Sequence, residues 1–209
     1  GVELSEGTVA VSGKVARAAG ETRFEASAGI DALRGSRNGE AIAWDAPTRI
    51  EVRGQQGGGA FKLDHFAVSS PFMSGSGSGD LNQLKLHLDA SLDKTLAEAG
   101  KFVDLKGLAA SGDMSLDLAV ISADAARNLD CSLQVPALSV SLPSGEHFGG
   151  DIQLGLKADV TAETVAISEC SLVVRNLSAG NADGTIRDDE ISIRTAGTIQ
   201  PASKQAQFP

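Results

Sequence analysis

The sequence predicts a mainly β protein: a long, curved and mostly antiparallel sheet with one or two short helices. Apolar and polar residues alternate with a period of two along most of the 209 residues, as in strands that bury one face. Turn-forming residues interrupt this alternation at near-regular spacing, which is typical of an antiparallel meander. Clear helical spacing occurs in a single segment. We hypothesise that this sheet is bent so that its aliphatic faces approach each other, as in a β-taco or groove.

Three alternating runs are the clearest strands. They lie within residues 84–92, 114–120 and 152–160, and nearly every second position in each is aliphatic. Weaker alternation predicts further strands within residues 9–15, 24–30, 42–52, 61–68, 129–135, 165–167, 172–174 and 191–199. The candidate lining residues of the groove come from the three clearest runs: Leu84, Leu86, Leu88, Met114, Leu116, Leu118, Leu154 and Leu156.

Several short stretches set the limits of these strands. The phase of the alternation slips between Leu63 and Phe66, which predicts a β-bulge near Asp64 and His65. Turns are predicted at residues 37–39, 55–59, 143–145, 181–184 and 187–189. The Gly-Ser alternation at 75–79 predicts the start of a strand; the alternative is a flexible linker, which would place a sub-boundary near 70–80 within a single elongated segment spanning 1–209.

The one segment with helical spacing covers residues 93–103. Asp93 can cap its N-terminus, and Leu92, Leu96, Ala99 and Val103 would then share one face. Residues 123–127 form a weaker candidate, for either a turn or a single helical turn.

Composition narrows the function. The chain has 7 Phe, one Trp and no Tyr, whereas enzyme pockets and recognition surfaces usually rely on aromatic residues. Leu, Val, Ile and Ala supply most of its apolar surface, which would make a smooth aliphatic wall. The net charge of −9 argues against nucleic acid and against a basic face for anionic lipid head groups. The chain starts at Gly1 without an initiator Met, so we expect a piece of a longer protein.

No residue pattern predicts catalysis, a metal or a cofactor. The three histidines have no partner at metal-ligand spacing, and His87 alternates with leucines, which places it on the solvated face. Residues 188–190 lack the spacing of a calcium loop, and residues 75–79 match neither a phosphate loop nor a nucleophile elbow. Cys131 is in phase with the apolar positions around it. Two free thiols are one interpretation of Cys131 and Cys170, and a disulfide in an oxidising compartment is the other.

The width of the predicted sheet leads to the main functional inference. Ten to twelve strands at a spacing of about 4.8 Å give a sheet roughly 50–60 Å wide. A helix about 10 Å across covers two or three strands at most. The remaining apolar face must fold onto itself as a sandwich, close as a barrel, or stay open and hold an apolar ligand.

The segment from Phe61 to Val120 also carries a family resemblance. It contains in order a Gly-rich strand at 77–81, the alternating strand at 84–92, the short helix, and a strand at 105–112 with Leu-x-Gly spacing. In this order it resembles the AsmA-like and TamB-like envelope proteins, the repeating β-groove group of bridge-like lipid transfer proteins. The resemblance implies a long curved sheet with a hydrophobic interior, a periplasmic body, and an inner-membrane anchor elsewhere in the full-length protein.

We therefore expect a non-catalytic segment of a bacterial envelope protein. Its groove would shield lipid acyl chains and support lipid transport or outer-membrane biogenesis. The expected partners are a phospholipid or another acyl-chain lipid and an outer-membrane or other envelope protein, and the sheet edges would also allow a homo-oligomer. The alternative is a structural or adhesive β-sandwich or solenoid with a dry core and no ligand. A polysaccharide-acting enzyme is disfavoured by the missing aromatic platforms.

Overall fold

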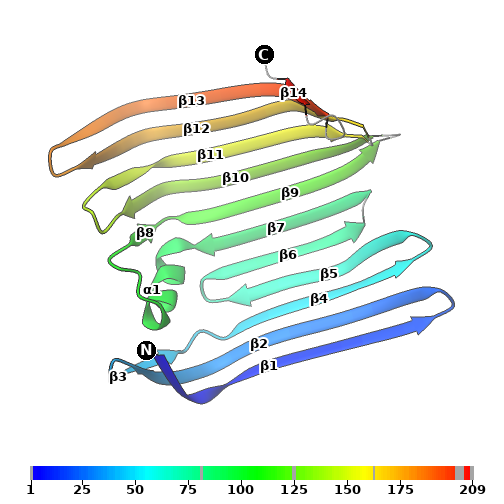
Figure 1. Ribbon diagram of the computed structural model, residues 1–209, viewed down its shortest axis with the longest axis horizontal. Coiled ribbons are helices and arrows are strands. Elements are labelled where there is room, and N and C mark those ends of the chain that lie inside the picture. The colour runs from blue at the N-terminus through cyan, green and yellow to red at the C-terminus, as the bar shows by residue number, and fades with distance from the viewer. Residues whose placement is uncertain (1, 81, 124–125, 162, 201–204, 208–209) are drawn as a thin grey trace.

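The computed structural model is one open antiparallel sheet with a single short helix at one end (Figure 1). It describes residues 2–80, 82–123, 126–161, 163–200 and 205–207. The predicted fold class is confirmed, because the described chain is mainly strand, antiparallel throughout and not closed into a barrel.

Each long strand lies beside its sequence neighbours, as expected for a meander. The spatial order is β1-β2-β4-β5-β6-β7-β9-β10-β11-β12-β13-β14, with β3 beside β2 and β8 beside β10. The strands are β1 (Val2–Ala18), β2 (Glu21–Arg37), β3 (Glu40–Trp44), β4 (Thr48–Gly57), β5 (Ala60–Ser70), β6 (Met73–Asp80), β7 (Gln83–Ser91), β8 (Ala109–Ser111), β9 (Asp113–Ala123), β10 (Ala126–Ser141), β11 (His147–Val160), β12 (Val165–Asn181), β13 (Gly184–Gln200) and β14 (Gln205–Gln207).

The predicted bulge in β5 is confirmed. Arg53 of β4 pairs with His65, and the next residue, Gly54, pairs with Leu63, so Asp64 has no partner in the ladder. The same irregularity appears on the β6 side between Leu63 and Phe66. The extra residue lets the apolar side chains on both sides of the bulge stay on one face of the sheet.

The Gly-Ser stretch is a fully paired strand. β6 forms ladders with β5 and with β7, so residues 73–80 belong to the continuous sheet and do not form a linker. Its glycines lie on one face and its serines on the other. A Cβ at Gly77 would overlap the Leu86 side chain, and one at Gly75 would lie 2.9 Å from both Leu88 and Val68. The missing side chains therefore make room for those of the neighbouring strands.

The single helix, α1, spans Leu92–Phe102 and departs from the prediction at both ends. Ser91, not Asp93, occupies the N-cap position, and its hydroxyl donates to the Asp93 carboxylate at 2.7 Å. This bond is the main reason that the pKa of Asp93 lies below its ordinary value. Val103 lies just past the last turn and is 58% exposed, so it does not share the packed face.

Strands β9 and β10 extend into the second helix candidate, at residues 123–127, from both sides. Ala123 ends β9 and Ala126 begins β10, and the two residues pair with each other. Asp124 and Ala125, at the centre of that candidate, lie outside the described residues.

Helix α1 packs at one end of the sheet, against β3, β7 and β8 (Figure 1). Trp44 lies between Phe72 and Phe102 there, with ring centroids 5.6 and 5.9 Å away. Arg37 donates to the Gly100 carbonyl at 2.8 Å and so ties the end of β2 to the helix. This cluster covers strand ends and leaves most of the sheet uncovered.

No second layer packs on the sheet within the described part of the chain, since every described strand belongs to the same sheet. Among the residues whose burial is described, six hydrophobic residues are buried: Ala46, Val68, Phe72, Val135, Ala158 and Val173. A dry two-sheet sandwich is therefore not formed by these residues alone. The helix described here is too short to cross a membrane.

Candidate functional site: an uncovered apolar face

Register pairing shows which side chains share a face, because directly paired residues of antiparallel strands point to the same side. One row of such pairs crosses the sheet through Leu88, and we call it the Leu88 row. It consists of Val11, Ala28, Ile50, Val68, Gly75, Leu88, Leu116, Leu133, Leu154, Leu172 and Ile193. Every member is apolar or glycine, and eleven strands at about 4.8 Å spacing make the row about 48 Å long.

Two more rows run beside it on the same face of the sheet, first the Leu86 row and then the Leu84 row. The Leu86 row consists of Gly13, Ala26, Val52, Phe66, Gly77, Leu86, Leu118, Cys131, Leu156, Cys170 and Thr195. The Leu84 row consists of Val15, Phe24, Gly54, Leu63, Gly79, Leu84, Val120, Leu129, Ala158, Ile167 and Gly197. Thr195, at the β13 end, is the single polar residue in the three rows. Together the rows form a continuous surface that we call the apolar face.

The structure places seven of the eight sequence-predicted lining residues in the three rows, and the eighth, Met114, in the next row on the same side of the sheet. Leu86 pairs directly with Leu118, and Leu88 with Leu116, while Met114 lies opposite Ala90. Leu154 and Leu156 lie on β11 and join these pairs through the intervening strand β10. Seven of the eight are half-buried, and Leu154 is 37% exposed.

Sequence reasoning missed the residues that make this surface continuous. Leu133 and Cys131 of β10 connect β9 to β11, and Phe66 and Val68 extend the face onto β5. The signal that could have found them is the same period-two phase, since each lies in a run already predicted as a strand. The register that joins the runs into rows is set by the pairing of strands in three dimensions.

Both cysteines are on the apolar face and both are free. Leu156 pairs with Cys131 on one side and with Cys170 on the other, so two strand spacings separate them. That distance is about 10 Å, whereas the Cα atoms of a disulfide lie within about 7 Å. Of the two interpretations drawn from sequence, the free thiols agree with this register.

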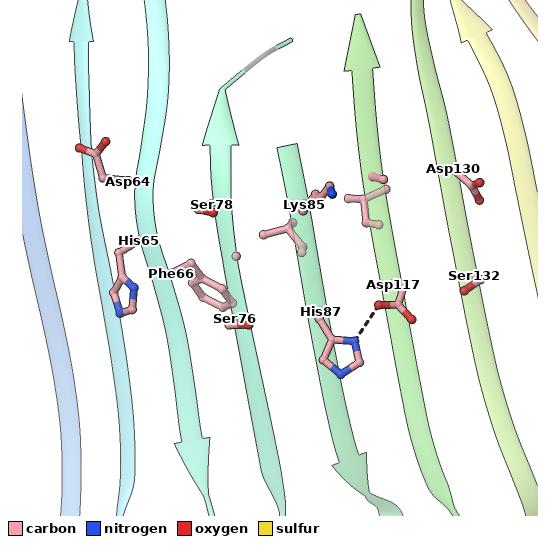
Figure 2. Close-up of a pocket in the computed structure, with 14 residues that line it drawn as sticks. Asp64, His65, Phe66, Ser76, Ser78, Lys85, His87, Asp117, Asp130 and Ser132 are labelled. Atoms are coloured by element: carbon pink, nitrogen blue, oxygen red, sulfur yellow. Dashed lines mark hydrogen bonds and ion pairs between the residues drawn. The ribbon is translucent and has the colours of Figure 1, made fainter. Parts of the chain in front are cut away.

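The opposite side of the sheet is polar and contains a shallow hollow of about 650 Å³ over β5–β10. Figure 2 shows Lys85, His87, Asp117 and Asp130 among its lining residues. His87 is on the solvated face, as the alternation predicts. Its Nδ1 lies 2.7 Å from Oδ1 of Asp117, and its Nε2 lies 2.8 Å from Oδ2 of Asp89.

These two contacts explain the electrostatics of His87. The hydrogen bond with Asp117, and then that with Asp89, raise the pKa of His87 above its ordinary value of 6.5. The bond with His87 is likewise the main cause of a lowered pKa for Asp89. A protonated imidazole held between two carboxylates forms an ion-pair bridge across β7 and β9 and is poorly suited to act as a base.

Other polar clusters form turns and ladders. The Asp188 carboxylate accepts from the backbone N–H of Glu190, and Asn181 accepts from the backbone of Asp183 in the β12–β13 hairpin. Over the described ranges, no three His, Cys, Asp or Glu residues are placed to hold a metal ion.

Comparison with known protein families, curated proteins and solved structures finds no match to this chain.

Proposed function

We propose that the apolar face holds the acyl chains of a phospholipid or another acyl-chain lipid, in a segment of an AsmA-like or TamB-like bacterial envelope protein. The observation that supports this proposal is the Leu88 row, which crosses all the long strands without a polar side chain and without a covering layer. The location proposed for this segment is the periplasm, with the membrane anchor elsewhere in the full-length protein.

The chemistry of the face suits hydrocarbon better than a specific polar ligand. Leu, Val, Ile and Ala occupy 22 of the 33 positions in its rows, Gly, Phe and Cys occupy ten, and Thr195 supplies the one hydroxyl; none carries a charge. Transfer of one methylene from water to such a surface contributes about 0.8 kcal/mol, so a chain of a dozen methylenes gains roughly 10 kcal/mol before ordering costs. An aliphatic wall also accepts chains of different length, since no contact depends on a fixed polar group.

The lipid would contact only one face of the sheet, with its acyl chains against the apolar face and its head group in the water above it. A hydrogen-bonded single layer cannot be crossed by a head group, so the head group must leave through the open side of the apolar face. The polar side meanwhile carries cross-strand ion pairs such as Arg53 with Glu25 and Lys157 with Glu169. These pairs keep that side hydrated, which leaves the apolar face as the surface available to hydrocarbon.

Native mass spectrometry of the purified chain, followed by lipid extraction, tests the proposal. We expect co-purifying acyl lipid and saturable binding of a fluorescent fatty acid. The variant L88S/L116S/L154S should lose most of this binding, because it places three hydroxyls in the centre of the Leu88 row.

A matched control carries changes on the other side of the sheet. Ser76 and Ser132 lie in the polar row that passes through His87, so S76A/S132A should bind the probe as the native chain does. Circular dichroism of both variants checks that the sheet is intact. A native chain that carries no lipid and shows no saturable binding would overturn the proposal.

A further inference from the structure

The first edge strand of the sheet is fully open. β1 has 17 residues, every one of them is exposed, and its outer edge pairs with no described strand. It contains no proline, and its two register irregularities, between Leu4 and Thr8, cancel so that the pairing resumes in phase. Natural edge strands are usually protected by proline, by charge, by bulges or by brevity, and a long regular edge is a template for another strand.

The other edge differs. β14 pairs with the last residues of β13, Thr198 to Gln200, and so blocks part of its outer side. The exposed remainder of β13 contains the charge cluster at 187–190, in which Glu190 already pairs with Arg175. β1 is therefore the edge that is free along its whole length.

The charges of β1 are arranged in a pattern that fits a specific partner. Its acidic residues, Glu3 and Glu6, lie in the first half, and its basic residues, Lys14 and Arg17, lie in the second half. Among the described residues, none of the four has an opposite charge within ion-pair distance. The charged residues of the adjacent strand β2 are paired elsewhere: Glu21 pairs with Arg23, and Glu25 pairs with Arg53 of β4.

We propose that β1 pairs antiparallel with β1 of a second copy of this chain, with Ala10 opposite Ala10 of the partner copy. In this register Glu6 lies opposite the partner copy's Lys14, and Glu3 opposite the partner copy's Arg17. The twofold axis repeats both pairs, so all four unpaired charges on each strand are matched. Counted residue by residue, the same register also sets Val2 against the partner copy's Ala18; the stretch from Thr8 to Ala18, beyond the irregularities of β1, forms its regular part.

Other arrangements lose this match. A shift of two residues in either direction leaves no acidic residue directly opposite a basic one. Parallel pairing in register would place Glu6 opposite Glu6 and Lys14 opposite Lys14, which is unfavourable. On the apolar face, the proposed register sets Val9 against the partner copy's Val11 and covers two side chains that are 61% and 77% exposed in the single chain.

The dimer would join two sheets edge to edge and continue the apolar face from one copy to the next. The inference does not rest on the proposed lipid function, because it depends only on the edge, its length and its charges. It commits to a second copy of this chain as the occupant.

Sedimentation velocity of the purified chain over a range of concentrations tests this pairing. We expect a reversible dimer. E3K/E6K places like charges opposite each other at four positions in the dimer and should weaken it at least tenfold. K14E/R17E should weaken it to the same degree. An equimolar mixture of the two variants restores four opposite-charge pairs, so it should form a heterodimer.

The control variant is D188K/D189K, which changes the net charge by the same amount as E3K/E6K but on the other edge of the sheet, and it should leave the dimer unchanged. A native chain that stays monomeric at the highest concentration would overturn the inference. So would a dimer that survives in both reversed variants, since it would lie on the apolar face or on β13. Failure of the mixture to associate would exclude this register and overturn the proposal as stated.

Discussion

The apolar face has two unlike halves that meet at β6. On β1, β2, β4, β5 and β6, seven of the fifteen positions in the three rows are Gly or Ala, including Gly13, Ala26, Ala28, Gly54 and Gly75, and only one is leucine. On β7, β9, β10, β11 and β12 they are built largely of leucine. We call these the small-residue half and the leucine half. The backbone pairing is the same in both.

The difference shows that the alternation of apolar and polar residues and the volume of the apolar side chains have separate effects on the sheet. Alternation sets which side of each strand is apolar, and it does so equally in both halves. Volume decides how far neighbouring side chains cover one another. In the leucine half the lining residues are mostly half-buried by their neighbours, whereas Val11 and Val15 of β1 are 77% and 73% exposed. We therefore expect the leucine half to hold most of the free energy of unfolding.

The largest expected effect lies at the junction of the two halves. Gly79 has φ +133, and a Cβ there would overlap the carbonyl oxygen of Gln83 on β7 and lie 2.7 Å from the Leu84 Cα. G79A should lower the free energy of unfolding by about 2–4 kcal/mol through backbone strain and overpacking, as measured by urea denaturation.

Gly13 provides the matched control in the small-residue half. A Cβ at this position would meet no atom within 4 Å. G13A should change the free energy of unfolding by no more than about 0.5 kcal/mol. Equal losses in the two variants would mean that glycine is needed for flexibility in general and not for the close approach of β6 to β7.

A smaller effect compares the halves directly. Leu118 packs between Leu86 and Cys131 in the leucine half, and Val11 lies on the exposed edge strand. L118A should cost about 1–2 kcal/mol, less than a fully buried leucine because the site is half open, and V11A about 0.5 kcal/mol or less. Thermal and urea unfolding of both variants provide the measurement. A larger loss for V11A would contradict the assignment of stability to the leucine half.

Much of the fold could be predicted from the sequence because apolar and polar residues alternate clearly along the central strands. The three leucine runs, the bulge at Asp64 and the Gly-Ser strand were all predicted from phase alone. Prediction was weakest where this alternation is weak. β1 spans Val2–Ala18, but only residues 9–15 were predicted as a strand, because Ser, Thr, Gly and Ala interrupt the alternation at both ends. The helix cap was misassigned because Ser91 and Asp93 are both good capping residues.

The sequence predicted several residues that line the candidate site, but not how far the apolar face extends across the sheet. Each lining leucine could be placed on a face from its own strand. Its neighbours could not, because cross-strand partners are set by hairpin register and not by local sequence. His87 illustrates the same limit on the polar side: its partner Asp117 is 30 residues away, and no motif spacing connects them.

The smallest expected effect tests whether that polar bridge supports the leucine half alone. Because the pKa of His87 is raised in the folded chain, its stabilising contribution is fully present below pH 6.5 and is lost as the pH rises through the higher folded value. Between about pH 6 and about pH 9, hydrogen exchange should quicken in β7 and β9 and stay unchanged, beyond the intrinsic rate, in β2 and β4. H87Q should remove this extra pH dependence. A uniform change across the sheet would show that the two halves unfold as one unit, so that a polar bridge in one half also stabilises the other.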